Sequence, residues 1–418
     1  MQKTPNSLRL HLGIFGRRNV GKSSLMNQLS EKNISIVSPK MGTTTDPVKK
    51  SIEIEPLGPV LLMDTAGLDD VGEQGKLRVT KTRQTIESTD LGILVIEPGL
   101  WGDFEEELFR LFQKTSAPLI VAINKTDKQE PDPNIIHQLE KEGISYCRVS
   151  ALKETGIDTL KHLLIENAPD SWINAPPVLR DLVNPGDIIV QVMPIDVEAP
   201  LGRILLPQVA AVREVMDCGA VSIVVKETEL NDAIESLMHP PDMVITDSQA
   251  FELVGKLTPA ESSLTSYSTL FARHKGDLPA YIRGVKTVDN LQDGDKILIA
   301  EACIHHPIGN DIGRVQIPAK LQRFTGKNLI FEFLQGKDYP DNLQGYKLVV
   351  HCGACVFNRR QVLHRITEAE KQKVAITNYG VLLAYLGNVL PRAIKPFFKV
   401  YPELQKYFNG DENEKNRQ

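Results

Sequence analysis

Residues 16–23, GRRNVGKS, have the residue types and the spacing of a phosphate-binding loop, G-x-x-x-x-G-K-S. The two glycines let the backbone curl so that its amides face phosphate oxygens. Lys22 neutralises the terminal phosphates, and Ser23 offers a hydroxyl to magnesium. An apolar stretch at residues 10–15 precedes the loop and the helix-like SSLMNQL follows it, as this motif requires. The segment predicts a site for a nucleotide and magnesium.

Asp64-Thr-Ala-Gly67 supplies a second element of this site. It follows the apolar residues 59–63, so the carboxylate lies at the C-terminal end of a predicted strand. There Asp64 can hold magnesium through water, and the amide of Gly67 can sense a γ-phosphate.

Asn124-Lys-Thr-Asp127 and Ser150-Ala151 each follow a further predicted strand. A carboxylate at Asp127 accepts hydrogen bonds from the ring N–H and the exocyclic amine of guanine, a pair that adenine lacks in that arrangement. A backbone amide at Ser150-Ala151 can close the base pocket. The set predicts binding of GTP and GDP. The expected contacts are Gly16, Asn19, Gly21, Lys22, Ser23, Ser24, Asp64, Gly67, Asn124, Lys125, Asp127, Ser150 and Ala151.

Three of the five cysteines gather in the last third of the chain, in Cys303-Ile-His305-His306 and His351-Cys352-Gly-Ala-Cys355. A C-x-x-C pair holds two thiolates near one metal centre, and a third from a distant segment closes the site. Three cysteines with a histidine fit either a structural zinc site or a 4Fe-4S cluster with one iron bound by another ligand. A redox C-x-x-C is less well supported, because no helix clearly begins at Cys352.

The elements that must position these residues follow from the apolar pattern. Residues 8–168 alternate short apolar runs with amphipathic ones, which predicts an α/β domain with a parallel sheet covered on both faces. Residues 180–260 repeat the pattern with three short strands, a thin sheet that would complete its burial against a second copy. Residues 264–405 are interpreted as an α+β domain, with strands near 296–300, 329–333 and 346–351 and one helix from 367 to about 386.

Composition sets the remaining bounds. The 418 residues suffice for about three domains. Lys and Arg number 48 and Asp and Glu 53, a net charge of −5, which argues against nucleic acid or anionic lipid as partners. No apolar run approaches the ~18 residues of a membrane span, so we expect no membrane and a cytoplasmic protein. Cys147 and Cys218 lie in apolar stretches and are expected to be small core residues.

The nucleotide motifs together resemble the translation-factor-related small GTPases, in particular the tRNA-modification and ribosome-assembly branch. The resemblance implies that Thr44, in Gly42-Thr-Thr-Thr-Asp46, is the magnesium ligand of the first switch, although Thr43 and Thr45 leave the choice open.

Two further residues bear on hydrolysis. Leu68 stands where Ras-like enzymes carry a water-positioning Gln, so intrinsic turnover should be slow. Asn19 matches the Asn that helps to hold potassium in potassium-activated relatives. Glu73 is a candidate for orienting water, with a solvated loop carboxylate as the alternative. Lys22, Thr44 and Glu73 are therefore the predicted catalytic residues.

The cysteine arrangement behind a GTPase domain and a small α/β domain resembles the maturation GTPases of the FeFe hydrogenases over nearly the whole chain. The resemblance implies a 4Fe-4S cluster on Cys303, Cys352 and Cys355 with an exchangeable fourth ligand, for which His305 and His351 are the first candidates and His306 the next. It also implies a homodimer formed through the middle domain. Such a scaffold would receive a di-iron precursor made with two radical-SAM maturases and pass it to apo FeFe-hydrogenase.

The alternative is a tRNA-modification or ribosome-assembly GTPase with a structural zinc. The acidic net charge speaks against it. In the C-terminal third, moreover, the basic residues Arg359, Arg360, Lys371 and Lys373 alternate with acidic ones, as on a solvated helix face.

Overall fold

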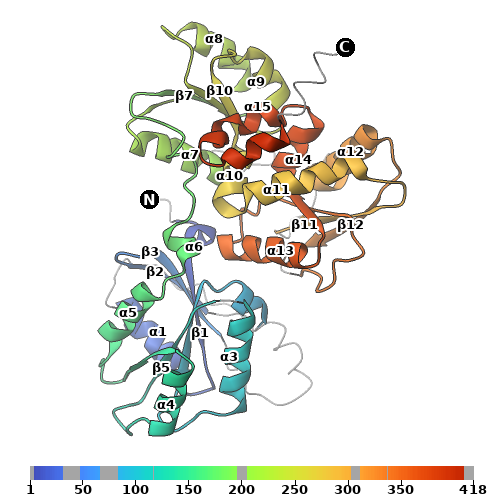
Figure 1. Cartoon of the computed structure of the whole chain (residues 1–418). Coiled ribbons are helices and arrows are strands. Elements are labelled where there is room, and N and C mark those ends of the chain that lie inside the picture. Colours follow the sequence, from blue (N-terminus) through green and yellow to red (C-terminus); the bar gives the residue numbers. More distant parts are fainter. Residues whose placement is uncertain are drawn as a thin grey trace. The chain divides into compact units, whose positions relative to one another are not determined.

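The computed structural model describes residues 4–31, 48–65, 83–115, 117–194, 205–302, 311–336 and 338–408. Within these ranges the chain forms three sheets and divides into two compact units (Figure 1). Unit 1 comprises Met1–Ala175 and Val356–His364, and unit 2 comprises Pro176–Cys355 and Arg365–Gln418. No helix in the described ranges is long and apolar enough to cross a membrane.

Unit 1 is built on a six-stranded sheet. Its elements are β1 (Leu10–Phe15), α1 (Lys22–Glu31), β2 (Val48–Ile54), β3 (Gly58–Asp64), β4 (Leu91–Ile96), α3 (Asp103–Thr115), β5 (Leu119–Ile123), α4 (Pro133–Lys141), β6 (Ser145–Arg148), α5 (Ile157–Glu166) and α6 (Asp170–Ile173). The strand order is β2-β3-β1-β4-β5-β6, and only the β2–β3 pair is antiparallel among the described strands.

Both faces of this sheet are covered. Strands β1 and β4 are buried along their whole length, because a sheet with helices on two faces has no solvent side. Alternate residues of β4 enter different apolar clusters, Ile93 and Val95 in one and Leu94 and Ile96 in the other. The predicted α/β domain is confirmed, and among the described strands only the antiparallel edge strand β2 departs from the predicted parallel sheet.

The second sheet, in unit 2, has the order β10-β9-β7-β8, with all pairs parallel. Its elements are β7 (Ile188–Val192), α7 (Leu206–Asp217), β8 (Val221–Val225), α8 (Leu230–Glu235), β9 (Met243–Thr246), α9 (Phe251–Leu257), β10 (Ser263–Ser266) and α10 (Tyr267–Lys275). The sequence interpretation of three strands was wrong, because β10 reads SLTS and lacks an apolar run. Thr265 and Ser266 are nevertheless fully buried, and the Ser266 hydroxyl accepts the Thr269 N–H to begin α10.

The third sheet, also in unit 2, has the order β12-β11-β13-β14 and is likewise parallel throughout its described strands. Its elements are α11 (Leu278–Val285), β11 (Lys296–Glu301), α12 (Ile317–Thr325), β12 (Ile330–Gln335), β13 (Leu348–His351), α13 (Arg359–Lys371), β14 (Ala375–Asn378), α14 (Tyr379–Leu386) and α15 (Leu390–Ile394). This domain is therefore α/β, and the α+β interpretation was wrong.

The predicted single helix from 367 to about 386 is also wrong. Helix α13 ends at Lys371, Lys373 adopts a left-handed φ of 58°, and strand β14 follows. The left-handed turn ends the helix, and Ile376 and Thr377 then pair with β13. The apolar pattern alone did not separate a buried strand from a buried helix.

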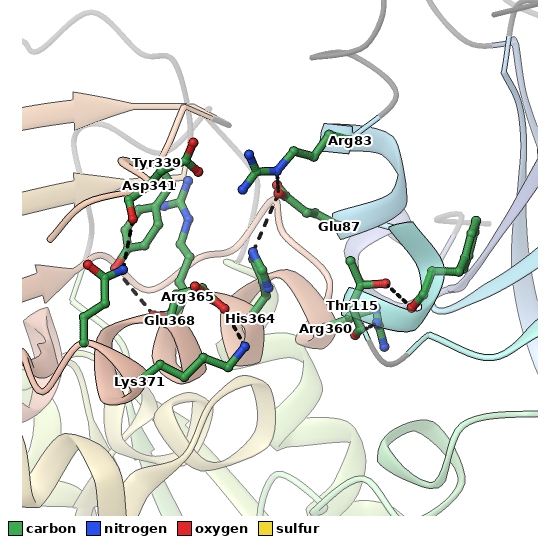
Figure 2. Close-up of polar contacts among 12 residues, drawn as sticks. Arg83, Glu87, Thr115, Tyr339, Asp341, Arg360, His364, Arg365, Glu368 and Lys371 are labelled. Carbon is green, nitrogen blue, oxygen red and sulfur yellow. Dashed lines mark hydrogen bonds and ion pairs between the residues drawn. The ribbon is translucent and has the colours of Figure 1, made fainter. Parts of the chain in front are cut away.

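The short second piece of unit 1, Val356–His364, follows Cys355 directly in the sequence and includes the beginning of α13, whose remainder belongs to unit 2. Asn358 is buried, and its side-chain amide donates to the Ser88 carbonyl (3.0 Å) and to Asp90 Oδ2 (3.1 Å). Asp90 Oδ2 also accepts the backbone N–H of His11 at 2.8 Å. Figure 2 shows two neighbouring contacts of the same segment, Arg360 with Thr115 and His364 with Glu87. Arg360 donates to the Thr115 carbonyl, and Nε2 of His364 lies 3.7 Å from Oε1 of Glu87.

Replacing Asn358 by Ala should destabilise unit 1. The change leaves the Ser88 carbonyl and the buried Asp90 carboxylate each without one donor, which costs about 2–3 kcal/mol for a site that includes a charged acceptor. Both tryptophans of the sequence, Trp101 and Trp172, lie in unit 1, so tryptophan fluorescence during urea unfolding reports on this unit. Asn231→Ala, an exposed position of unit 2, is the control. An unchanged midpoint for Asn358→Ala would contradict the assignment of this segment to unit 1.

Candidate functional site

The phosphate loop joins β1 to α1 and has the backbone that its glycines permit. Gly16 and Gly21 have φ values of 139° and 97°. A Cβ on Gly16 would lie 2.3 Å from the Val95 carbonyl oxygen, and one on Gly21 would lie 2.2 Å from Asn124 Nδ2. Lys22 is buried, and its ammonium donates to the Gly16 carbonyl at 2.8 Å. The loop therefore holds the lysine charge where phosphates would bind.

Ser23 and Asp64, the two predicted magnesium-side residues, lie together. Ser23 Oγ donates to Asp64 Oδ2 at 2.7 Å. Burial raises the pKa of the Asp64 carboxyl, while Ser23 and the Lys22 charge oppose this. Asp64 Oδ1 is buried and has no hydrogen-bond partner among the described residues. An orphaned carboxylate oxygen beside a serine hydroxyl fits a magnesium ion with its water shell.

The residues predicted to recognise the base converge from the ends of β5 and β6. Ser150 Oγ donates to Asp127 Oδ1 at 2.6 Å, which lowers the pKa of that carboxyl and keeps it an acceptor. Asn124 accepts the Ala151 N–H at 3.0 Å and donates to the Val20 carbonyl at 2.8 Å. Asn124 thus links the segment predicted to close the base pocket to the phosphate loop.

These segments line one cavity of about 430 Å³. Seven of the predicted contacts lie in its wall, from the phosphate loop, α1 and the two segments predicted to bind the base. The lining residues are Asn19, Gly21, Ser24, Asn27, Gln28, Asn124, Lys125, Asp127, Lys128, Ala151 and Leu152. Tertiary structure therefore joins motifs that lie about a hundred residues apart in the sequence into one pocket.

An ion pair behind the phosphate loop escaped the sequence analysis. Arg17 Nε and Nη2 each donate at 2.8 Å to the carboxylate of Glu105 on α3, which is only 1% exposed. The Arg17 guanidinium also lies over the Phe104 ring. Three consecutive glutamates, Glu105, Glu106 and Glu107, lie on α3. Their spacing in the sequence did not indicate that Glu105 is the buried one. The pair holds the loop from the side of α3.

Several predicted residues lie outside the described ranges. These are the switch residues Thr43, Thr44, Thr45, Gly67, Leu68 and Glu73 and the metal candidates Cys303, His305 and His306.

The Cys352–Cys355 loop begins at the end of β13, beside β11. Ala300 and His351 are register partners, and the Cys352 N–H donates to the Ala300 carbonyl at 2.9 Å. Cys352 Sγ accepts the N–H groups of Ala302 at 3.1 Å and of Ala354 at 3.4 Å. The structure therefore places the thiol of Cys352 against the residue that precedes Cys303 in the sequence. Among the described residues, no group of three metal-ligating side chains is complete.

His351 is fully buried with both ring nitrogens in hydrogen bonds. Nε2 lies 3.0 Å from Arg365 Nη1, and Nδ1 lies 2.8 Å from the Cys352 carbonyl oxygen. A guanidinium can only donate, so Nε2 is the acceptor and Nδ1 carries the proton. Burial, and next the Arg365 charge, lower the pKa of His351 to about 3. Iron binding by this ring would require one of these hydrogen bonds to break.

The other two cysteines differ from each other. Cys147 is buried, and burial raises its pKa to about 12, which confirms a core residue. Cys218, in contrast, is half-buried at the end of α7, so its assignment to the core was wrong. The apolar pattern around it belongs to a helix end that is partly exposed.

Three family models match this chain. A 50S ribosome-binding GTPase model matches residues 11–125, a hydrogen maturase F dimerization domain matches residues 178–276, and a hydrogen maturase F tetramerization domain matches residues 279–396.

Curated relatives include the tRNA modification GTPase MnmE of Chromobacterium violaceum, 37% identical over 162 residues, which are 38% of this chain and 34% of that protein. GTPase Der of Wolinella succinogenes is 35% identical over 176 residues, 40% of this chain and 37% of that protein. This chain therefore covers little more than a third of either relative. Among solved structures, an Aquifex aeolicus Era variant bound to GDP and AlF4− is 23% identical, with 52% of this chain and 93% of that chain covered and a TM-score of 0.33.

The six-stranded sheet, the phosphate loop and the pocket define a P-loop GTPase domain, which is followed by two further parallel α/β domains. The second and third domains match models of one family and together span more than half of the chain. The chain belongs to the hydrogen maturase F family, the GTPases of hydrogenase maturation. Its dimerization and tetramerization domains indicate a homo-oligomer.

Proposed function

We propose that this protein is a GTP-hydrolysing scaffold that binds a 4Fe-4S cluster on Cys303, Cys352 and Cys355 and carries a di-iron precursor to apo FeFe-hydrogenase. Two radical-SAM maturases would supply that precursor. The proposal keeps the predicted domains, residues 8–168 for GTP, 180–260 for dimerisation and 264–405 for the cluster.

The observation that carries the proposal is the position of the Cys352 thiol. Its sulfur accepts the Ala302 N–H at 3.1 Å, so a thiol of the C-x-x-C loop lies one residue from the third cysteine of the motif. Two backbone N–H groups directed at one sulfur are typical of a thiolate that binds a cluster, because they stabilise its negative charge. Cys355 is exposed, so a metal can reach the loop. When bound, the cluster supplies an iron site to which another metal fragment can attach.

On the GTPase side, the described residues bind and orient the nucleotide. Asp127 would accept hydrogen bonds from guanine, Lys22 would neutralise the phosphates, and Ser23 would bind magnesium with Asp64 behind it. The predicted Thr44 and Glu73 would act from the switch segments. Asn19, whose φ is 64° and which lines the cavity, would help to bind potassium near the phosphates.

The edge strand β8 supports dimerisation through the middle domain. Among the described strands β8 pairs only with β7, and its Val221 and Val224 side chains are about half exposed. An apolar edge strand is a ready surface for a second copy of the chain.

Anaerobic reconstitution with iron and sulfide tests the proposal. We expect a brown protein with broad visible absorbance and bound iron in proportion to protein. Stoichiometric zinc with co-purifying RNA, and no cluster after reconstitution, would instead support the RNA-modification or ribosome-assembly alternative.

Potassium should accelerate GTP hydrolysis relative to sodium by several-fold, because a cation held near the phosphates offsets their negative charge as an arginine finger does. Asn19→Ala should remove most of this difference, measured as phosphate release in matched KCl and NaCl. Asn134→Ala, an exposed position on α4, is the control. Equal rates in the two salts for the unsubstituted protein would show that Asn19 only shapes the loop.

A further inference from the structure

Two buried cationic side chains of unit 2 reach the Cys352–Cys355 loop from different elements. Lys275, at the end of α10, is 2% exposed, and its ammonium lies 3.4 Å from the Ala354 carbonyl oxygen and 3.5 Å from that of Cys355. Arg365, on α13, is 4% exposed and contacts the loop through His351. Neither residue belongs to the cysteine motif, and neither was singled out by the sequence.

Among the described residues, Arg365 contacts Gly336, Tyr339 and His351. Nη2 donates to the Gly336 carbonyl at 2.7 Å, and the guanidinium lies 4.7 Å from the centre of the Tyr339 ring. Figure 2 shows the side chains of Arg365 and Tyr339 next to each other. Arg365 Nη1 donates to His351 Nε2, and His351 Nδ1 donates to the Cys352 carbonyl. The chain of hydrogen bonds therefore runs from Arg365 to the backbone of the first cysteine of the loop.

Lys275 acts on the other end of the loop. Its buried ammonium lies against the carbonyl groups of Ala354 and Cys355, so its positive charge is fixed beside the second cysteine of the loop. A buried positive charge interacts more strongly with a nearby anion than an exposed one does. A cluster held by thiolates is anionic and gains a further negative charge on reduction, so the buried charges of Lys275 and Arg365 would favour its reduced form.

We propose that Lys275 and Arg365 are positioning residues of the cluster site, which hold the Cys352–Cys355 loop from its two ends and stabilise the reduced cluster through their buried positive charge. His351 then transmits the position of Arg365 to the loop and does not bind iron. This inference rests on the proposed cluster-binding function. It predicts that the cluster is easier to reduce than it would be in a neutral surrounding.

The test is an EPR-monitored redox titration of reconstituted protein. Lys275→Gln can still donate to both carbonyls but lacks the charge, and Arg365→Gln makes the same change at the other end. Each should keep its iron and shift the reduction potential to more negative values, and Lys275→Arg and Arg365→Lys should largely restore it. Lys256→Gln and Arg283→Gln remove exposed charges of unit 2 and serve as controls with no shift.

NMR of the apo protein tests the positioning role of Arg365 separately from the effect of its charge on the cluster. In the apo protein with nitrogen-15-labelled histidine, the His351 resonances, assigned by their loss in His351→Gln, should show a neutral ring with the proton on Nδ1. Arg365→Gln should move the Nε2 resonance, whereas Arg283→Gln should not. A His351 ring protonated on Nε2 at neutral pH would overturn the hydrogen-bond chain.

The remaining outcomes are decisive. Unchanged potentials in iron-loaded Lys275→Gln and Arg365→Gln would overturn the electrostatic role, as would loss of iron from both the neutral and the charge-conserving variants. Loss of iron from the neutral variants alone would support the role of charge in holding the loop. If the unsubstituted protein itself takes up no cluster, it is the proposed function that fails, and this result is distinct from the others.

Discussion

Asp127→Asn should reduce the affinity for GTP and GDP by about a hundredfold, which corresponds to about 2.8 kcal/mol. A carboxylate at this position can accept from two guanine N–H groups at once, whereas Asn replaces one acceptor oxygen by an amide that donates. Ser150 now donates to Asp127 Oδ1 at 2.6 Å, so the side chain is already oriented before nucleotide binds. Xanthine nucleotides, which carry a carbonyl where guanine has an amine, should gain affinity. Equilibrium binding of fluorescent GDP and XDP measures both changes.

The matched control is Asp132→Asn. Asp132 lies in the same unit, caps α4 by accepting the Asn134 N–H at 2.8 Å, and is replaced by a residue that caps a helix equally well. Its nucleotide preference should stay that of the unsubstituted protein. Retained guanine preference in Asp127→Asn would show that the cavity recognises the base by other groups.

Ser in place of Cys303, Cys352 or Cys355 should abolish the visible chromophore of the reconstituted protein while GTP hydrolysis continues. A serine hydroxyl is not deprotonated at neutral pH and is a poor ligand for iron in a sulfide cluster. Hydrolysis should survive because the two sites belong to different units. The nucleotide cavity lies in unit 1, whereas the Cys352–Cys355 loop lies in unit 2. Iron content, visible absorbance and phosphate release are measured on each variant.

Cys218→Ser is the control for this series, because Cys218 is a half-buried thiol at a helix end and belongs to neither site. It should keep both the chromophore and GTP turnover. A full iron complement in any one of the three loop variants would exclude that cysteine as a ligand.

The nucleotide site was predictable because its chemistry is local. Each motif occupies a few consecutive residues after an apolar strand, and strand ends of a parallel sheet meet at one edge. Asn124 and Asp127 could thus be placed beside the phosphate loop before any contact was known. In the structure, Asn124 donates to the Val20 carbonyl of that loop.

Elements of the later domains were less predictable where burial and polarity disagree. Strand β10 is polar in sequence, yet Leu264, Thr265 and Ser266 are buried, and the Ser266 hydroxyl shares a hydrogen bond with that of Thr269. Strand β14 is apolar enough to extend a helix, and only the left-handed turn at Lys373 and the pairing with β13 make it a strand. In both segments, non-local packing outweighed the local pattern.

The residue types and their spacing determined the GTPase motifs, the cysteine set and the parallel architecture of the first domain, since each depends on side-chain chemistry or on a short period in the chain. Only the tertiary structure decided that Glu105 holds Arg17, and that Lys275 and Arg365 reach the cysteine loop. From sequence alone, a charged residue on a helix is predicted to be exposed to solvent, because most charged helix residues are exposed. Whether it is buried against a loop tens of residues away depends on how sheets and helices pack, and no short motif records that.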